Sequence, residues 1–233
     1  MVALRVSILI PAYNEAATVR QVLERVAALP LDTEIVVVDD GSTDDTPAIL
    51  AGWAGGRDDT VVLTQPNLGK GAAVRAAIAR ASGDICVIQD ADLEYDPEDL
   101  PRLVRPIADG YADVVYGSRL KGGSPQRAFM FWHLVGNRFL SLLASVLYDT
   151  PLSDIETGYK AFRTETLRSL DLHEDGFGVE PEITAQICRR RVRIFELPIS
   201  YSGRGYADGK KITWRHGLEA VRVLFEQRVD GRG

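Results

Sequence analysis

Short apolar runs alternate with segments of helical periodicity along the first half of the chain. The runs are rich in Val and Ile and lack the polar alternation of a half-exposed strand. Between them, apolar residues such as Val19, Leu23 and Val26 recur on one face of a helix. This pattern predicts a parallel sheet with helices on both faces. The predicted strands are 5–11, 34–40, 60–65, 84–90 and 113–118, and the predicted helices are 15–29, 44–54, 70–82 and 97–109.

The second half has a less regular pattern. Residues 128–147 predict a long helix whose apolar residues share one face, and this suits either the core or a membrane interface. The arginines of CRRRVR at 188–193 suit a solvated helix end. The other predicted elements are a loop over 150–163, a helix over 180–191, a strand over 193–201, a basic loop over 202–212 and a helix over 214–229.

Composition narrows the classes of function. The 233 residues include 27 basic and 33 acidic ones, and a net charge of −6 argues against a nucleic-acid binder that works through bulk positive charge. Cys86 and Cys188 lack metal-site spacing, so we expect reduced core thiols in a cytoplasmic protein. No apolar run reaches the about 20 residues of a membrane span, and the first residues predict a strand rather than a signal peptide.

Four acidic residues crowd the segment QDADLEYDP, which overlaps the end of the strand predicted over 84–90. In an extended segment Asp90 and Asp92 point the same way, and Glu94 joins them if the strand continues. Converging carboxylates need a counter-charge, and Mg²⁺ or Mn²⁺ supplies it when phosphate oxygens complete the ligand set. Asp96 precedes a proline and instead suits the N-cap of the next helix.

Motifs of several other ion and nucleotide sites are missing. An EF-hand that starts at Asp90 would need Gly and Glu where Tyr95 and Pro101 stand. The first strand is not followed by the G-x-G-x-x-G of dinucleotide-binding sheets. Neither GKG at 69–71 nor GKKI at 209–212 continues as a phosphate-binding P-loop.

A nucleoside site remains compatible with the ends of the first two strands. Tyr13 can stack on a base, while Glu15 and Asp40 can accept hydrogen bonds from ribose or base. The structural alternative is that Asn14 caps the first helix and that Asp39 or Asp40 caps a turn.

Eight motifs in a fixed order resemble a family 2 glycosyltransferase of the GT-A fold, and they are most similar to the polyprenyl (dolichyl) phosphate mannose or glucose synthase branch. They are ILIPAYNE, VVVDDGSTDDT, NLGKGAA, QDADLEYDP, DVVYGSR, IETGYKAFR, GFGVEPEIT and GRGYADGKK, from about residue 5 to about residue 215. The resemblance implies an α/β fold with a mostly parallel central sheet flanked by helices. It also implies one domain over 1–233, with a nucleotide-sugar-binding half over 1–118, an acceptor half over 119–215 and an amphipathic C-terminal helix over 214–229.

The resemblance also implies an activity. We expect an inverting, Mg²⁺- or Mn²⁺-dependent transfer of a hexose from GDP-mannose or UDP-glucose to a polyprenyl or dolichyl phosphate at the membrane surface. The alternatives are a soluble hydroxyl acceptor and a non-catalytic nucleotide-sugar-binding protein. We expect a cytoplasmic protein, peripheral at the inner face of the membrane, with no nucleic-acid partner and with room for a membrane partner protein.

Matching motifs assign site residues by resemblance. Asp90, Asp92 and Glu94 would meet the metal, although Glu94 stands where relatives commonly carry Gln. The residues assigned to catalysis are Asp92, Arg119, Asp154 and Glu156. Those assigned to the nucleotide sugar are Pro11, Ala12, Tyr13, Glu15, Val38, Asp40, Lys70, Asp90, Ala91, Arg119, Arg204 and Lys210.

The acceptor decides whether a general base is needed. A phosphate monoester has a second pKa of about 6 and is already ionised, so it needs none. A hydroxyl acceptor needs a carboxylate to take its proton, and Asp154 and Glu156 are the candidates. The alternative is that the segment DIETG around them is a simple turn.

Overall fold

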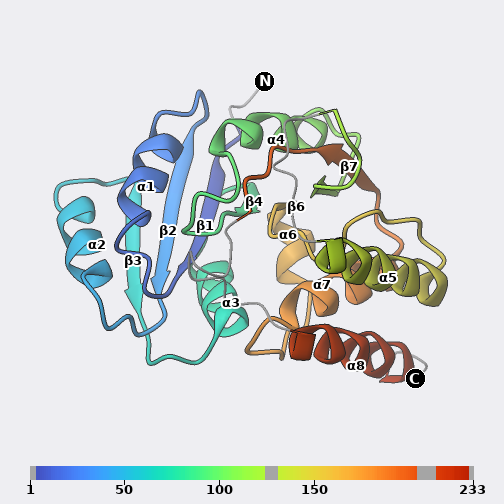
Figure 1. Cartoon of the computed structure of the whole chain (residues 1–233). Coiled ribbons are helices and arrows are strands. Elements are labelled where there is room, and N and C mark those ends of the chain that lie inside the picture. Colours follow the sequence, from blue (N-terminus) through green and yellow to red (C-terminus); the bar gives the residue numbers. More distant parts are fainter. Residues whose placement is uncertain (1–3, 124–130, 204–213, 231–233) are drawn as a thin grey trace.

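A seven-stranded sheet forms the centre of the molecule (Figure 1). The computed structural model describes residues 4–123, 131–203 and 214–230. In these residues the strand order is β3-β2-β1-β4-β6-β5-β7, which confirms the predicted α/β fold with a mostly parallel sheet. The strands are β1 (Val6–Ala12), β2 (Thr33–Asp39), β3 (Thr60–Thr64), β4 (Ile85–Ile88), β5 (Val114–Ser118), β6 (Lys160–Arg163) and β7 (Ile194–Pro198).

The strand β6 is the largest departure from the sequence prediction. It lies antiparallel between β4 and β5, in a segment that was predicted as an uninterrupted loop over 150–163. That prediction is wrong because the strand has only four residues and starts with a fully buried lysine, Lys160. Neither an apolar run nor an alternating pattern marks such a strand.

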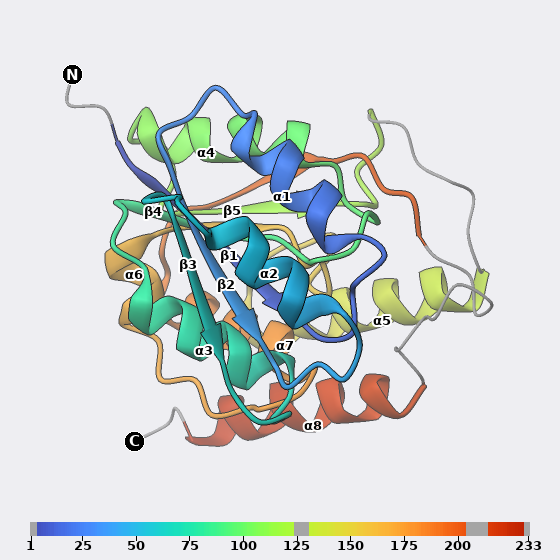
Figure 2. The ribbon, with the colours of Figure 1, turned by 90° about the vertical axis from the view of Figure 1, so that its left-hand side faces the viewer.

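Helices cover both faces of the sheet, and each face has its own apolar core (Figures 1 and 2). One core is closed by α1 (Val19–Ala27), α2 (Thr46–Ala54) and α4 (Leu100–Ala108), the last preceded by the 3₁₀ turn η1 (Pro97–Asp99). The other is closed by α3 (Lys70–Arg80), α5 (Phe131–Tyr148), α6 (Thr164–Arg168), α7 (Val179–Arg190) and α8 (Trp214–Asp230). Burial on both faces explains why the strands lack polar alternation.

The capping predictions for Asp96 and Asn14 have different outcomes, and Asp39 caps a turn as predicted, because its Oδ1 accepts from the backbone N–H of Ser42 (3.1 Å). Asp96 accepts a hydrogen bond from the backbone N–H of Glu98 (2.9 Å), which confirms it as the N-cap. Asn14 does not cap α1, which begins at Val19. Its Oδ1 instead accepts from the backbone N–H of Thr43 (2.8 Å) and joins the loops that follow β1 and β2.

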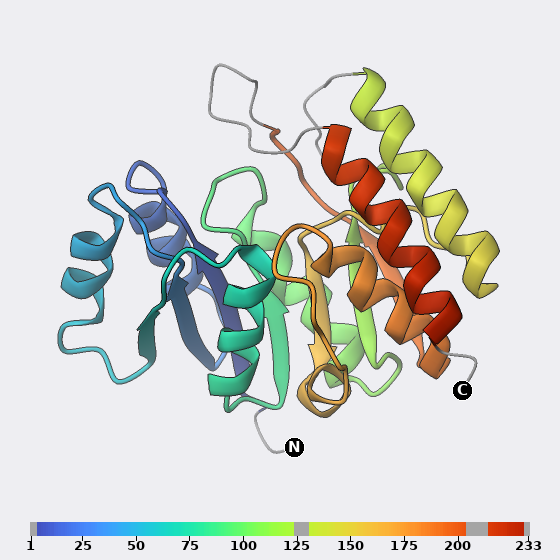
Figure 3. The same ribbon diagram turned by 90° about the horizontal axis from the view of Figure 1, so that it is seen from below.

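Helices α5 and α8 lie side by side on the outside of α7 (Figure 3). Helix α5 begins at Phe131, and residues 128–130 of the predicted helix lie outside the described residues. Most of the predicted basic loop also lies outside them, since the description stops at Gly203 and resumes at Trp214. Within the described ranges, none of the helices is both long and apolar enough to cross a bilayer.

Candidate active site

A cavity of about 340 Å³ opens at the carboxyl ends of β1, β2 and β4. This edge of a parallel sheet is where such folds bind ligands, because the loops that leave neighbouring strands converge there. Most residues that the sequence nominated lie around this cavity, although their individual roles remain predictions. They are Pro11, Ala12, Tyr13, Glu15, Asp40, Lys70, Asp90, Ala91, Asp92, Glu94, Arg119 and Glu156.

Two nominated residues do not line the cavity. Val38 is buried within strand β2, and Asp154 is fully buried behind Arg119. Arg204 and Lys210 fall outside the described residues.

Four further residues that the sequence did not indicate also line the cavity. Glu180 comes from the first turn of α7, Phe177 from the loop before it, Tyr201 from the segment after β7 and His216 from the first turn of α8. The motif GFGVEPEIT contains two of these residues. No periodicity or spacing in it indicated which side chains face a ligand.

Lys70 joins two carboxylates at the cavity wall. Its Nζ lies 2.8 Å from Asp90 Oδ1 and 2.7 Å from Glu180 Oε1. Burial alone would lower the pKa of this ammonium, but the two carboxylates outweigh it and hold the pKa well above its ordinary value. Lys70 is therefore charged and fixes Asp90 relative to α7.

The carboxylates of Asp90 and Asp92 fit a divalent cation that shares its coordination with phosphates. Asp90 Oδ2 packs so closely on Gly158 that a Cβ there would lie 2.4 Å away. Asp92 Oδ1 accepts from the backbone N–H of Glu94 (3.1 Å). Among the described residues no three potential ligands are grouped into a complete metal site. Mg²⁺ needs only one or two carboxylates when phosphate oxygens and water complete its shell.

Glu94 is tied to the opposite wall of the cavity. Its Oε2 accepts from the hydroxyl of Tyr201 (2.7 Å), and its backbone carbonyl accepts from the N–H of Ser202 (2.8 Å). These bonds join the acidic loop after β4 to the segment after β7. The role of Glu94 as a third metal ligand stays a prediction, because its carboxylate already has a structural partner.

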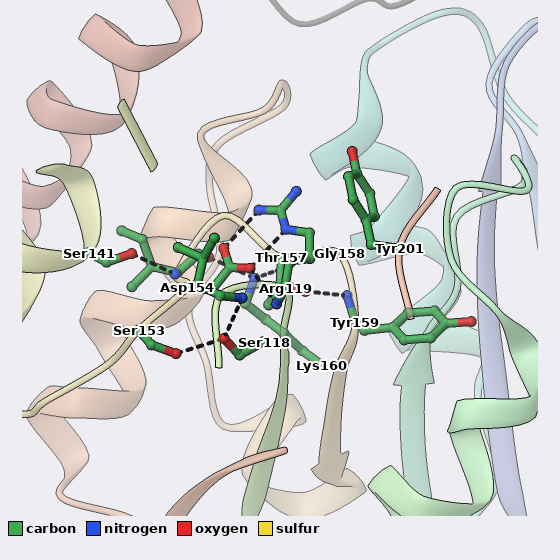
Figure 4. A network of polar contacts seen from close by, with 12 residues as sticks. Ser118, Arg119, Ser141, Ser153, Asp154, Thr157, Gly158, Tyr159, Lys160 and Tyr201 are labelled. Atoms are coloured by element: carbon green, nitrogen blue, oxygen red, sulfur yellow. Dashed lines mark hydrogen bonds and ion pairs between the residues drawn. The ribbon is translucent and has the colours of Figure 1, made fainter. Parts of the chain in front are cut away.

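Arg119 and Asp154 form a buried ion pair beside the cavity (Figure 4). Arg119 donates from Nε (2.8 Å) and Nη2 (2.7 Å) to the two carboxylate oxygens, and its backbone N–H adds a third bond (3.0 Å). Burial would raise the pKa of Asp154, but Arg119 lowers it below its ordinary value. The Tyr201 ring lies 5.2 Å from the guanidinium carbon. The clamp therefore fixes a permanent positive charge at the cavity wall.

Glu156 lies at the cavity two residues after Asp154 and has a different environment. Burial raises the pKa of Glu156 to about 7, and the Glu180 carboxylate adds to the shift. The buried Lys160 holds the backbone on either side of Glu156, since its Nζ donates to the carbonyls of Ile155 (3.0 Å) and Thr157. One buried ammonium group thus holds the loop around Glu156, and the pKa of the Glu156 carboxyl group lies above its ordinary value.

Asp40 shapes the cavity by holding the loop that leads into α3. Its carboxylate accepts from the side chain of Gln65 (2.7 Å) and from the backbone N–H groups of Leu68 (2.9 Å) and Gly69 (2.8 Å). This loop delivers Lys70 to the cavity. Asp40 therefore holds this loop in place. Its contact with the nucleotide sugar stays a prediction.

The fold and the site define a class of protein. The mostly parallel sheet matches a solved glycosyltransferase of the GT-A fold, and the Asp-Ala-Asp segment that follows β4 lies at the cavity. The chain belongs to glycosyl transferase family 2, whose family model matches residues 7–170.

Relatives and a solved structure agree with this assignment. The chain is 33% identical to the undecaprenyl-phosphate mannosyltransferase of Micrococcus luteus, over 89% of this chain and 87% of the relative. It is 30% identical to the dolichol-phosphate mannosyltransferase of Pyrococcus furiosus, over 89% of this chain and 59% of the relative. Glucosyl-3-phosphoglycerate synthase from Mycobacterium tuberculosis, in complex with Mn²⁺, UDP-glucose and phosphoglyceric acid, matches with a TM-score of 0.74 and 25% identity, over 97% of this chain and 80% of that chain.

Several relatives are longer than this chain. It spans 52% of the low-salt glycan biosynthesis hexosyltransferase Agl6 of Haloferax volcanii, to which it is 32% identical over 92% of its own length.

Proposed function

We propose that this glycosyltransferase moves a hexose, with inversion, from a nucleotide diphosphate sugar to the phosphate of a polyprenyl or dolichyl lipid. One observation carries the proposal: a single cavity contains the carboxylates of Asp90 and Asp92 and the clamped guanidinium of Arg119. The two carboxylates suit a metal ion that binds the donor diphosphate. The guanidinium suits the phosphate of the acceptor. Relatives named for transfer to undecaprenyl phosphate and dolichol phosphate support this acceptor class.

The donor is proposed to lie along the loops after β1 and β4. Pro11, Ala12, Tyr13 and Glu15 line the cavity and suit the nucleoside. A divalent cation at Asp90 and its neighbours would neutralise the diphosphate and the charge that grows on the leaving group. Mg²⁺ or Mn²⁺ is proposed because the carboxylate donors are hard oxygens. GDP-mannose and UDP-glucose are the donors to test.

The acceptor phosphate is proposed to bind Arg119. Within the described residues, Nη1 of its guanidinium makes no hydrogen bond, so it can donate to a phosphate oxygen. The ionised phosphate oxygen then bonds to the anomeric carbon while the bond from that carbon to the nucleotide diphosphate breaks. No proton is removed, which agrees with a carboxylate of Asp154 that is wholly engaged by Arg119.

A hydroxyl acceptor is the second candidate. Glu156 lies at the cavity, and a pKa of about 7 is suited to a general base at neutral pH. The solved synthase that shares this fold is in complex with UDP-glucose and phosphoglyceric acid. A soluble hydroxyl compound of that kind therefore belongs in any acceptor screen.

A lipid acceptor has a consequence for location. We propose that the protein works in the cytoplasm, peripheral at the inner face of the membrane, where a membrane partner protein is an additional option. Arg204 and Lys210, outside the described residues, are proposed to meet donor phosphates.

A donor and acceptor screen tests the proposal. Purified protein is given UDP-glucose or GDP-mannose together with polyprenyl phosphate, phosphoglyceric acid or no acceptor, in Mg²⁺, Mn²⁺ or EDTA. We expect release of nucleotide diphosphate that requires both the metal and polyprenyl phosphate. Release that depends on neither would overturn the proposal.

The variant Glu156→Gln separates the two acceptor classes. With a lipid phosphate we expect only a modest loss of turnover, because no proton has to be removed. With a hydroxyl acceptor the loss of a general base is worth about 10²- to 10⁴-fold.

A further inference from the structure

Three tyrosine rings form a row that leads from the core to the cavity. Tyr159, just before β6, is fully buried, and its ring stacks on that of Tyr95 with 4.6 Å between the ring centroids. The ring of Tyr201 follows, 5.3 Å from that of Tyr95. Tyr95 and Tyr201 both line the cavity. This tyrosine row therefore connects the cavity wall to side chains that the core holds in place.

Arg119 lies at the cavity end of the tyrosine row. Its guanidinium carbon is 5.2 Å from the centre of the Tyr201 ring, and Figure 4 shows Arg119 between Asp154 and Tyr201. A guanidinium this close to an aromatic face is attracted by the ring. The Asp154 carboxylate accepts from Nε and Nη2, and the ring covers one face of the guanidinium. A phosphate is therefore directed to Nη1.

The carboxylate of Glu94 holds the Tyr201 side chain at its hydroxyl end. Its Oε2 accepts from that hydroxyl (2.7 Å), and a charged acceptor makes such a bond stronger than one between neutral groups. The backbones support the contact, since Tyr95 and Tyr201 form an antiparallel bridge and the N–H of Ser202 donates to the carbonyl of Glu94 (2.8 Å). A rotation of the Tyr201 side chain away from Arg119 has to break the hydroxyl–carboxylate bond.

We propose that Tyr201 and Glu94 are positioning residues for the acceptor phosphate. Glu94 fixes Tyr201, and Tyr201 holds the guanidinium of Arg119 in the orientation that meets the phosphate. The proposal rests on the proposed function, since it takes Arg119 as the group that binds the acceptor. It gives Glu94 a different role from the metal contact that the sequence suggested. In this role neither side chain touches the reacting atoms.

A divalent cation is the competing partner of Glu94. Mg²⁺ takes one or two carboxylates when phosphate oxygens and water complete its shell, and Asp90 and Asp92 already supply two at the cavity. Oε2 of Glu94 is engaged by the Tyr201 hydroxyl instead. A glutamine can accept the same bond through its amide oxygen, whereas an alanine cannot. Substitutions at position 94 therefore separate the two roles.

Steady-state kinetics with polyprenyl phosphate measure the effect on the acceptor. Tyr201→Phe keeps the ring and removes the hydroxyl that Glu94 holds. We expect its KM for polyprenyl phosphate to rise about tenfold, the value of one hydrogen bond to a charged group, while its KM for the nucleotide sugar stays at the wild-type value. Glu94→Ala breaks the same bond and should give the same rise, with an unchanged Mg²⁺ concentration at half-maximal rate. Glu94→Gln should keep the wild-type KM.

A double variant and two controls complete the kinetic test. Tyr201→Phe/Glu94→Ala should have the same KM for polyprenyl phosphate as either single variant, because both substitutions remove one and the same bond. The control Tyr111→Phe removes an exposed hydroxyl elsewhere. The control Glu98→Ala removes an exposed carboxylate four positions after Glu94. Both controls should keep the wild-type KM values.

Chemical modification of Arg119 tests the geometry without any reaction of the enzyme. Phenylglyoxal, which modifies arginine side chains, is added to the full chain without donor or acceptor, and mass spectrometry quantifies the peptide that contains Arg119. The Arg119 side chain is only 12% exposed, so its modification should be slow in the wild type. It should be several times faster in Tyr201→Phe and Glu94→Ala, whose Tyr201 ring no longer has the bond that keeps it over Arg119. Glu94→Gln and the two controls should react as the wild type does.

Three results would overturn the positioning proposal. They are Tyr201→Phe with wild-type KM for polyprenyl phosphate and wild-type modification of Arg119, single effects that add up in the double variant, and Glu94→Ala whose main defect is a higher requirement for Mg²⁺. A wild-type protein that transfers nothing to polyprenyl phosphate would refute the proposed function alone. The modification of Arg119 needs no substrate, so it would still test how Glu94 and Tyr201 hold that side chain.

Discussion

The variant Asp154→Asn distinguishes a positioning role of this carboxylate from the general-base role that the sequence suggested. Asp154 has no exposed surface and receives three hydrogen bonds from Arg119, two of them from the guanidinium. An amide keeps the shape but removes the charge that balances the buried guanidinium. Removal of one partner from a buried ion pair costs about 3–5 kcal/mol, and a retained amide oxygen places the expected loss near the lower value.

The predicted loss is large enough to measure. For a chain of this size each kcal/mol shifts Tm by about 2–4 °C, so a loss of about 3 kcal/mol lowers Tm by about 6–12 °C. Thermal unfolding followed by circular dichroism measures this shift. A displaced Arg119 should also lower turnover with polyprenyl phosphate about 10²-fold, because small errors in position are costly in catalysis.

The double variant Arg119→Gln/Asp154→Asn provides the control. It leaves no unpaired buried charge, so its Tm should be higher than that of Asp154→Asn alone. Turnover should stay low, because the guanidinium is absent. A Tm of Asp154→Asn within about 2 °C of wild type, together with a large loss of turnover, would refute the reasoning and restore the general-base role.

Three further variants test the site. Asp92→Ala should abolish metal-dependent donor binding in calorimetry and with it turnover; full activity would contradict the metal assignment. Gly158→Ala should weaken metal-dependent donor binding about tenfold or more, because its Cβ would lie 2.4 Å from Asp90 Oδ2 and displace that carboxylate. Gly52→Ala, whose Cβ meets no atom within 4 Å, is its control. Burial raises the pKa of Glu156 from its ordinary value of 4.5 to about 7, so between these pH values the carboxyl group is protonated in the folded state and ionised in the unfolded state. The free energy of unfolding should therefore fall as pH rises from about 4.5 to about 7. Glu156→Gln should flatten this dependence in urea unfolding at pH 5 and pH 7, and an unchanged slope would contradict the assigned shift.

The parallel half of the fold could be predicted because its burial is visible in local sequence. Strands covered on both faces appear as uninterrupted apolar runs, and chemically active side chains such as Asp90 follow where those runs end. Strand β6 could not be predicted in this way. Its first residue, Lys160, is buried because carbonyls of a preceding loop and the ring of Tyr116 surround its ammonium group.

Contacts between residues that are far apart in the sequence explain why the other features of the site could not be predicted. Asp154 was a candidate general base from the sequence, because its partner Arg119 lies 35 positions earlier in the chain and only the fold brings the two together. Glu180 lies in a helix that was predicted, but its place at the cavity depends on an ion pair with Lys70, 110 positions earlier in the chain. The periodicity of α5 was visible in the sequence. The side that faces outward was not, because apolar faces normally turn toward the core.

The antiparallel insertion of β6 also determines when β4 and β5 become joined during synthesis. Strands β4 and β5 do not pair with each other, since each pairs with β6. Both leave the ribosome before β6, which begins at Lys160, about 40 residues after β5 ends at Ser118. At about 5–20 residues per second the two open strand edges wait for seconds. Unpaired edges of this kind can recruit another chain, so the nascent protein is expected to need chaperone protection at least until β6 joins β4 to β5.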